Sequence, residues 1–242
     1  MKVIFVLIII ILVLLPTSAY SEFNNTYKFI GFKILGPDPT ICIMEPDELI
    51  QPRFWEVGFI DSILSASQEW VTTMNEVGGN WDFHYQFYFW EEHKDKAPSD
   101  FKQCNVFVIF HNTYRGSELG YTSYSYSQSN HKYAIVSIHT TIDVNHIDVS
   151  EYDNIMVNNV DLDLCIINKT ILHEFGHVLG LGHYQNPYEK YSIMTPFLNY
   201  RECDDDRTIT EIDIGMLVML YGSDGFEIRD NPIGLDRIVE IN

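Results

Sequence analysis

Residues 170–196 read TILHEFGHVLGLGHYQNPYEKYSIMTP, and this stretch decides the fold. His173 and His177 are four positions apart. On a helix of about 3.6 residues per turn their side chains therefore face the same way, one turn apart. Two imidazoles in this arrangement can bind one metal ion. A third histidine, His183, is too far along to reach that ion from the same helix.

Gly180 lies between the second and third histidines and offers a way around this geometric problem. Because glycine has no Cβ, it can adopt a positive φ, end the helix and turn the chain back. Three neutral imidazoles suit Zn²⁺ at about 2.0–2.1 Å and leave a fourth tetrahedral position open, which is typical of catalytic sites. The sequence therefore predicts one zinc ion held by His173, His177 and His183.

Glu174 adjoins the first predicted ligand and points to a neighbouring side of the helix. A carboxylate there can take a proton from a metal-activated water and pass it to a leaving amine. The pattern therefore predicts peptide-bond hydrolysis with Glu174 as the general base. The alternative is a core helix with hydrogen-bonded histidines, which leaves an acidic residue unexplained on an otherwise apolar helix.

Composition limits the possible partners. The chain has 242 residues, of which 46% are hydrophobic, and this suits one large domain. Its formal net charge of −19 repels phosphate groups and anionic lipids. Nucleic acids and membrane surfaces are therefore not expected partners, and we expect a monomer that acts on a peptide or protein.

The first 19 residues have the pattern of a secretory signal peptide. Lys2 precedes an unbroken apolar run over residues 3–15, and small residues follow up to Ala19. The run is shorter than the roughly 20 residues that span a bilayer, so an uncleaved membrane anchor is the less favoured alternative. We predict a signal peptide over residues 1–19, a catalytic domain over residues 20–242, and an extracellular location.

The four cysteines are widely spaced, without a Cys-x-x-Cys pair, and are Cys42, Cys104, Cys165 and Cys203. This spacing argues against a thiolate zinc site. Export favours two disulfides, each of which stabilises by about 2–4 kcal/mol. Three pairings are possible, and the sequence does not choose between them.

Hydrophobic periodicity indicates the early secondary structure. Apolar residues at helical spacing over residues 60–74 predict a helix that ends at Gly78 and Gly79. Apolar and aromatic segments predict strands at Thr40–Met44, 81–90, 105–110 and 133–139. This order favours an α+β or α/β domain with a mainly parallel sheet.

The later segments are more polar. Residues 116–130 are rich in Ser, Tyr and Gly and could form a flexible loop, but residues 121–124 and Tyr126 also suit a polar edge strand. Residues 140–163 are acidic and indicate a long surface loop. Thr210, with Asp213 three positions on, indicates the N-cap of a last helix that ends at Tyr221.

Residues 173–183 (HEFGHVLGLGH) and 192–196 (SIMTP) resemble the metzincin pattern of an extended zinc motif followed by a methionine-containing turn. Within the metzincins the sequence most resembles the matrixins. Astacins and serralysins have a tyrosine two residues after the methionine, where this chain has Pro196, as matrixins do. Residues 209–222 (ITEIDIGMLVMLYG) also resemble the matrixin C-terminal helix.

The resemblance implies an α+β metzincin-type fold. This fold has a twisted, mainly parallel five-stranded sheet with one antiparallel edge strand, an active-site helix and a C-terminal helix, in two subdomains around a cleft. Met194 would lie beneath the zinc without binding it. An extended substrate would pair with the edge strand at residues 119–126, which includes Gly120, Tyr121 and Thr122.

The resemblance also implies a pocket for the side chain that follows the cleaved bond. Its wall would contain Pro196, Phe197, Leu198 and Tyr200. Because most of these residues are apolar, we expect cleavage before hydrophobic residues.

Three features depart from the matrixin pattern. Only about 20 residues separate the predicted signal cleavage site from the first predicted strand, so we expect no long prodomain. Cys42 only loosely resembles the matrixin latency cysteine, and a disulfide or buried thiol is the favoured interpretation. His139, Asp143 and His146 are candidates for a structural zinc loop, but we favour solvated loop residues.

The acidic segment is also a candidate for calcium binding, through Asp143, Asp148, Asp153, Asp161 or Asp163. No EF-hand or glycine-rich repeat spacing is present, so a solvated loop is favoured. The alternative function for the whole chain is a zinc-stabilised module that binds peptides or proteins without cleaving them. Glu174 argues against it, because a buried carboxylate costs stability that a binding module has no need to lose.

Overall fold

The computed structural model describes residues 27–29, 38–48, 50–114, 119–126, 132–143, 159–161, 163–184, 191–196 and 207–221. The predicted signal peptide, residues 1–19, lies outside these segments. No helix in the described segments combines the length and the apolar character needed to cross a membrane.

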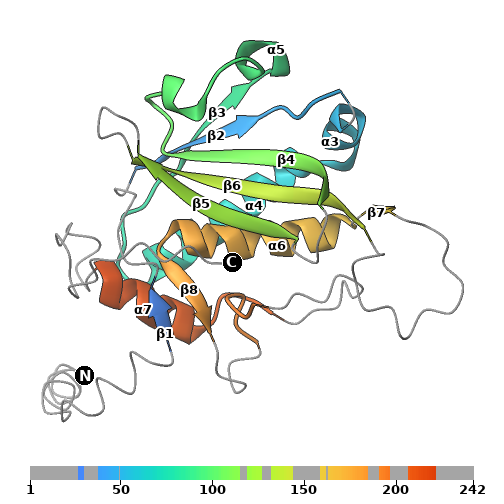
Figure 1. Cartoon of the computed structure of the whole chain (residues 1–242). Helices are drawn as coiled ribbons and strands as arrows, with labels where there is room; N and C mark the ends of the chain where they lie inside the picture. The colour runs from blue at the N-terminus through green and yellow to red at the C-terminus, as the bar shows by residue number, and fades with distance from the viewer. Residues whose placement is uncertain are drawn as a thin grey trace, which may run out of the picture.

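A mixed β-sheet forms the upper part of the molecule in Figure 1. Its strand order is β3-β2-β4-β6-β5. The bounds are β2 (Thr40–Met44), β3 (His84–Tyr88), β4 (Val106–Tyr114), β5 (Gly120–Tyr126) and β6 (Lys132–Asp143). Four strands are parallel, and β5 is antiparallel to β6 at one edge. The predicted sheet, including its antiparallel edge strand, is confirmed.

Helix α6 (Leu164–Val178) lies below the sheet in Figure 1, and α4 (Phe59–Glu76) passes behind the strands. Below α6 lie α7 (Glu211–Tyr221) and an antiparallel ribbon of β1 (Tyr27–Phe29) and β8 (Leu181–Tyr184). The shorter elements are α3 (Gln51–Val57), α5 (Trp90–His93), a 3₁₀ turn at Pro98–Asp100, and β7 (Asn159–Asp161). The α+β fold is thus confirmed, with α6 between the sheet and the C-terminal elements.

The central strands β2, β4 and β6 are buried on both faces, which explains their nearly continuous apolar sequences. In β4, Val106 and Val108 face the main core with α4 and α6, whereas Phe107 faces a smaller core. The smaller core contains Cys42 and Cys104, which form a disulfide across 62 positions of sequence. The structure therefore selects one of the three possible pairings and makes Cys42 a bonded cysteine. Cys165 is also disulfide-bonded.

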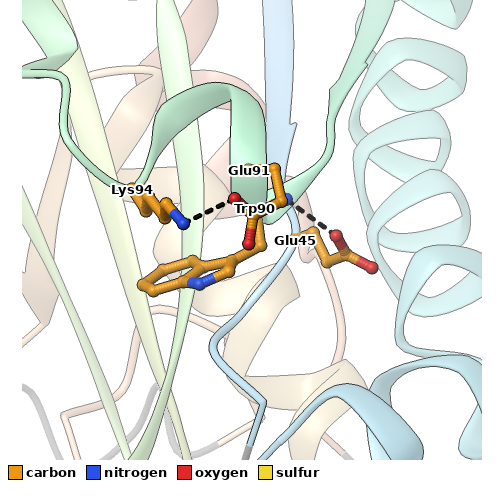
Figure 2. Close-up of polar contacts among 4 residues, drawn as sticks. All are labelled: Glu45, Trp90, Glu91 and Lys94. Atoms are coloured by element: carbon orange, nitrogen blue, oxygen red, sulfur yellow. Dashed lines mark hydrogen bonds and ion pairs between the residues drawn. The ribbon is translucent and has the colours of Figure 1, made fainter.

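Glu45 fixes the end of β2 to two short helices. Its Oε1 accepts a hydrogen bond from the Trp55 indole of α3 at 3.0 Å. Its Oε2 accepts a hydrogen bond from the Trp90 backbone N–H, the first residue of α5, at 2.7 Å (Figure 2). Lys94 and Glu91 form an ion pair beside it (Figure 2). Both oxygens of this buried carboxylate therefore act as structural acceptors.

The acidic segment differs from its prediction. β6 extends through Asp143, and β7 pairs with this extension, so residues 140–143 and 159–161 are strand rather than loop. His139 is only 3% exposed, so the prediction of a solvated loop residue is wrong for it. The parallel register of β4 and β6 places it opposite His111. His146, Asp148 and Asp153 lie outside the described residues.

Candidate metal centre and active site

The end of α6 and the start of β8 bring the three predicted ligands together. The Nε2 atoms of His173 and His177 are 3.1 Å apart, and that of His183 lies 3.0 Å from the first and 3.1 Å from the second. They form an almost equilateral triangle of nitrogen atoms. Within the described segments, this is the one group of three or more potential metal ligands.

The outer nitrogens of two of these rings are held by backbone carbonyls. His173 Nδ1 lies 2.6 Å from the Ile193 carbonyl oxygen, and His177 Nδ1 lies 2.7 Å from that of Leu181. A carbonyl only accepts, so each Nδ1 carries the proton and each Nε2 keeps its lone pair. The carbonyl partners thus fix the tautomer that a metal ligand needs.

These lone pairs converge on one point, and that arrangement fits a cation. Two unprotonated nitrogens 3.1 Å apart repel each other unless a positive charge lies between them. Tetrahedral zinc with bonds of about 2.0–2.1 Å holds its nitrogens about 3.3–3.4 Å apart, close to the separations here. His173, His177 and His183 therefore suit one zinc ion.

Burial keeps these imidazoles neutral. Burial, together with the nearby His183, lowers the pKa of His173 to about 3. Burial also lowers the pKa of His177 well below its usual value, and the neighbouring His173 adds to the effect. At neutral pH both side chains are therefore in the form that binds metal.

Gly180 makes the turn that brings in the third histidine. Its φ is 101°, a left-handed conformation that favours glycine, and it lies between α6 and β8. The Tyr221 hydroxyl of α7 donates to the Leu179 carbonyl at 2.8 Å and satisfies an acceptor at this helix end. The predicted turn is confirmed, and it places His183 on β8.

Met194 packs against the helix between the first two ligands. It is fully buried, and a Cβ added to Gly176 would lie 2.2 Å from its sulfur and 3.0 Å from the Trp70 ring. Only glycine therefore allows this close approach. The preceding residue, Ile193, supplies the carbonyl that holds His173, so the turn supports this ligand directly.

Asp213 fixes this turn to α7. Its Oδ1 accepts from the Ser192 hydroxyl at 2.8 Å, and its Oδ2 accepts from the Thr210 N–H and hydroxyl, both at 2.7 Å. Ser192 Oγ in turn accepts from the Met194 N–H at 2.9 Å. The sequence indicated Asp213 only as a helix cap. Its contact with Ser192 joins residues 21 positions apart, so no local sequence pattern predicts it.

Glu174 lies in α6 beside the metal ligands and is 3% exposed. Its Oε2 accepts a hydrogen bond from the Thr122 hydroxyl of β5 at 2.7 Å. Two positions further along β5, the Tyr124 hydroxyl donates to the His177 carbonyl at 2.5 Å. Burial raises the pKa of Tyr124 well above its usual value, so this hydroxyl remains a donor.

The sequence did not assign these two hydroxyls a role. Gly120, Thr122 and Tyr124 are every second residue of β5, so their side chains share one face of the strand. This period of two is the sequence pattern that could have placed the two hydroxyls on the same face. Tyr121 lies between them on the other face and is 40% exposed.

The predicted specificity pocket is described only at its start. Pro196 is half-buried after the Met194 turn, whereas Phe197, Leu198 and Tyr200 lie outside the described residues. Within the described segments, no group of acidic ligands suggests a calcium site.

Comparisons with known proteins place this site in a family. The matrixin profile matches residues 66–222, which is more than half of the chain and includes the three histidines. The chain belongs to the matrixin family. This membership supports a zinc metallopeptidase, in agreement with the geometry of the histidines.

The crystal structure of archaemetzincin from Methanopyrus kandleri is similar over 75% of this chain and 94% of that chain, with 12% sequence identity and a TM-score of 0.36. A search of curated proteins gave no match.

Proposed function

We propose that this matrixin is a secreted, zinc-dependent endopeptidase that uses Glu174 as its general base. The observation that carries the proposal is the convergence of three Nε2 atoms at 3.0–3.1 Å beside a buried carboxylate. A structural zinc site has its four positions filled by protein, whereas three protein ligands leave one for chemistry.

The residues of the site have separate roles in the proposed reaction. His173, His177 and His183 would hold the zinc ion, which would supply a Lewis acid for the scissile carbonyl and the attacking water. Glu174 takes the proton from the attacking water and returns it to the leaving amine. The Ile193 and Leu181 carbonyls keep two imidazoles in the tautomer that leaves Nε2 free to bind.

Substrate recognition is proposed to use the open edge of β5. This strand ends the sheet order, and an extended peptide can add to such an edge through backbone hydrogen bonds. The apolar stretch that begins at Pro196 favours a hydrophobic side chain after the cleaved bond. Burying a leucine-sized group there contributes about 1.5–3 kcal/mol, or about 10- to 150-fold in specificity.

The chain is proposed to act outside the cell as one catalytic domain over residues 20–242. Cleavage of the first 19 residues would release it from the membrane during export. The second candidate function is a zinc-stabilised module that binds peptides without cleaving them. Such a module would use the same three zinc ligands, but it would give Glu174 no functional role.

The test uses protein exported by expressing cells and purified from their medium. After zinc reconstitution it is incubated with a diverse peptide library, with and without a chelator, and the cut sites are mapped by mass spectrometry. We expect chelator-sensitive cleavage before Leu, Ile, Met or aromatic residues. Zinc-loaded protein that binds peptides but cuts none would support the binding module instead. Cuts mainly before charged residues or glycine would overturn the pocket assignment.

A further inference from the structure

The backbone of β5 alternates between the neighbouring strand and the open edge. The His139 N–H donates to the Leu119 carbonyl at 2.9 Å, and the register continues without a break along both strands. In an antiparallel pair, alternate residues bond to the partner strand. The residues between them therefore turn their N–H and C=O groups to the outer edge, and these are Gly120, Thr122 and Tyr124. Within the described segments no strand pairs with that edge.

The side chains of the same three positions face α6. A Cβ on Gly120 would lie 2.8 Å from the Thr170 methyl group, so the strand backbone nearly touches the helix there. Next, the Thr122 hydroxyl bonds Glu174 Oε2 at 2.7 Å. Tyr124 then bonds the last turn of the helix through the His177 carbonyl. β5 is therefore fixed to the helix at three successive points.

We propose that Thr122 is a positioning residue that couples substrate binding on β5 to the carboxylate of Glu174. Its N–H and C=O lie at the edge where a peptide would pair, and its hydroxyl holds Oε2. One residue thus sets the distance between the docked peptide and the proton acceptor. This inference rests on the proposed function and assigns a residue of the edge strand to the orientation of the base.

The choice of threonine supports this role. A β-branched side chain has few χ1 rotamers, so the hydroxyl is held toward Glu174 with little loss of rotamer freedom. Proton transfer requires the carboxylate within about 3 Å of its partner, and small displacements reduce the rate strongly. Thr122 acts through Glu174, so its loss should reduce turnover rather than peptide affinity.

The test compares zinc-loaded wild type with Thr122→Val and Thr122→Ser on a peptide that the wild type cleaves. Valine keeps the shape and removes the donor, whereas serine keeps the donor. We expect Thr122→Val to lower kcat about 10- to 100-fold, the effect of losing a hydrogen bond to a charged group, with KM within about threefold. Thr122→Ser should recover kcat to within about threefold.

Thr72→Val is the matched control, because Thr72 is exposed on α4 and loses the same hydroxyl. We expect wild-type kinetics from it. Crystal structures of the zinc-loaded variants give a readout independent of activity. The 2.7 Å contact with Glu174 should persist in Thr122→Ser, and the carboxylate should turn away in Thr122→Val. If the valine variant does not fold, Thr122→Ala is measured in the same way.

Three outcomes would overturn the inference. They are a wild-type kcat in Thr122→Val, a change in KM alone, and a serine variant as slow as the valine variant. A wild-type protein that cleaves no peptide would instead overturn the proposed function. Cleavage that depends on Glu174 but not on the Thr122 hydroxyl would overturn the coupling and leave the peptidase proposal standing.

Discussion

Two buried glutamates show how neighbours give the same side chain different tasks. Glu45 is 8% exposed and Glu174 is 3% exposed. Glu45 accepts one hydrogen bond on each oxygen, from Trp55 of α3 and Trp90 of α5 (Figure 2). These bonds join helices to the end of β2. The carboxylate therefore stabilises the fold at the end of the sheet where those short helices pack.

Glu174 lies instead between His173 and His177 on α6, where three imidazole nitrogens converge. Its Oε2 accepts a hydrogen bond from Thr122 of β5, the strand that ends the sheet order of the described residues. Burial alone therefore does not identify a catalytic carboxylate. The groups around Glu45 give its charge a structural role, whereas the groups around Glu174 suit the proton-accepting role proposed for it.

The sharpest test of this contrast exchanges each glutamate for glutamine. Glu174→Gln cannot accept the proton, so we expect peptide cleavage to fall by about 10²- to 10⁴-fold or more, with zinc content and melting temperature retained. Glu45→Gln should keep kcat but lose about 1–3 kcal/mol of stability, because the amide oxygen can still accept one of the two bonds while the amide NH2 group faces the other donor. Kinetics, metal analysis and urea unfolding of both variants decide this. If the two variants lost activity and stability to a similar extent, the two glutamates would not have different roles.

The disulfide near Glu45 should contribute only to stability. Replacing both Cys42 and Cys104 by alanine removes a cross-link across 62 positions, and we expect a loss of about 2–4 kcal/mol in the free energy of unfolding. Zinc affinity, measured by competition with a chelator, should stay unchanged because the bond lies in the smaller core. A marked loss of zinc in the folded variant would show that the two regions are coupled.

Gly176 tests packing at the metal centre itself. An alanine Cβ would approach the Met194 sulfur to 2.2 Å, so we expect Gly176→Ala to lose about 1–3 kcal/mol of stability. Because the displaced turn also carries the Ile193 carbonyl, zinc affinity should fall as well. Gly215→Ala on α7 is the control, since a Cβ there meets nothing within 4 Å. A Gly176→Ala protein with wild-type zinc affinity would contradict the support assigned to Met194.

His139 tests whether a buried histidine away from the metal also affects stability. Burial lowers its pKa to about 4, whereas the unfolded chain binds the proton near the usual value of 6.5. Its contribution to stability is therefore present above about pH 6.5 and is lost as the pH falls toward 4. Between pH 7 and 5 we expect His139→Gln to lose less stability than wild type, by at most about 2 kcal/mol. Equal pH dependence in urea unfolding would contradict this.

The sequence by itself determined the local geometry of the metal centre. The helical period places His173 and His177 on one face, and only a glycine readily makes the turn at position 180. Both properties depend on neighbouring residues alone. The strand at Thr40–Met44 was predictable for the same reason, because an apolar run between turn signals is a local pattern.

Only the tertiary structure decided which distant groups meet. Thr122 and Glu174 are 52 positions apart, and Cys42 and Cys104 are 62 apart. His139 is buried because β6 pairs with β4 in one particular register. Periodicity gives the face of a strand but not its partner or its register, since those depend on how the whole chain packs its core. The side chains that orient the proposed base therefore became visible only in the folded molecule.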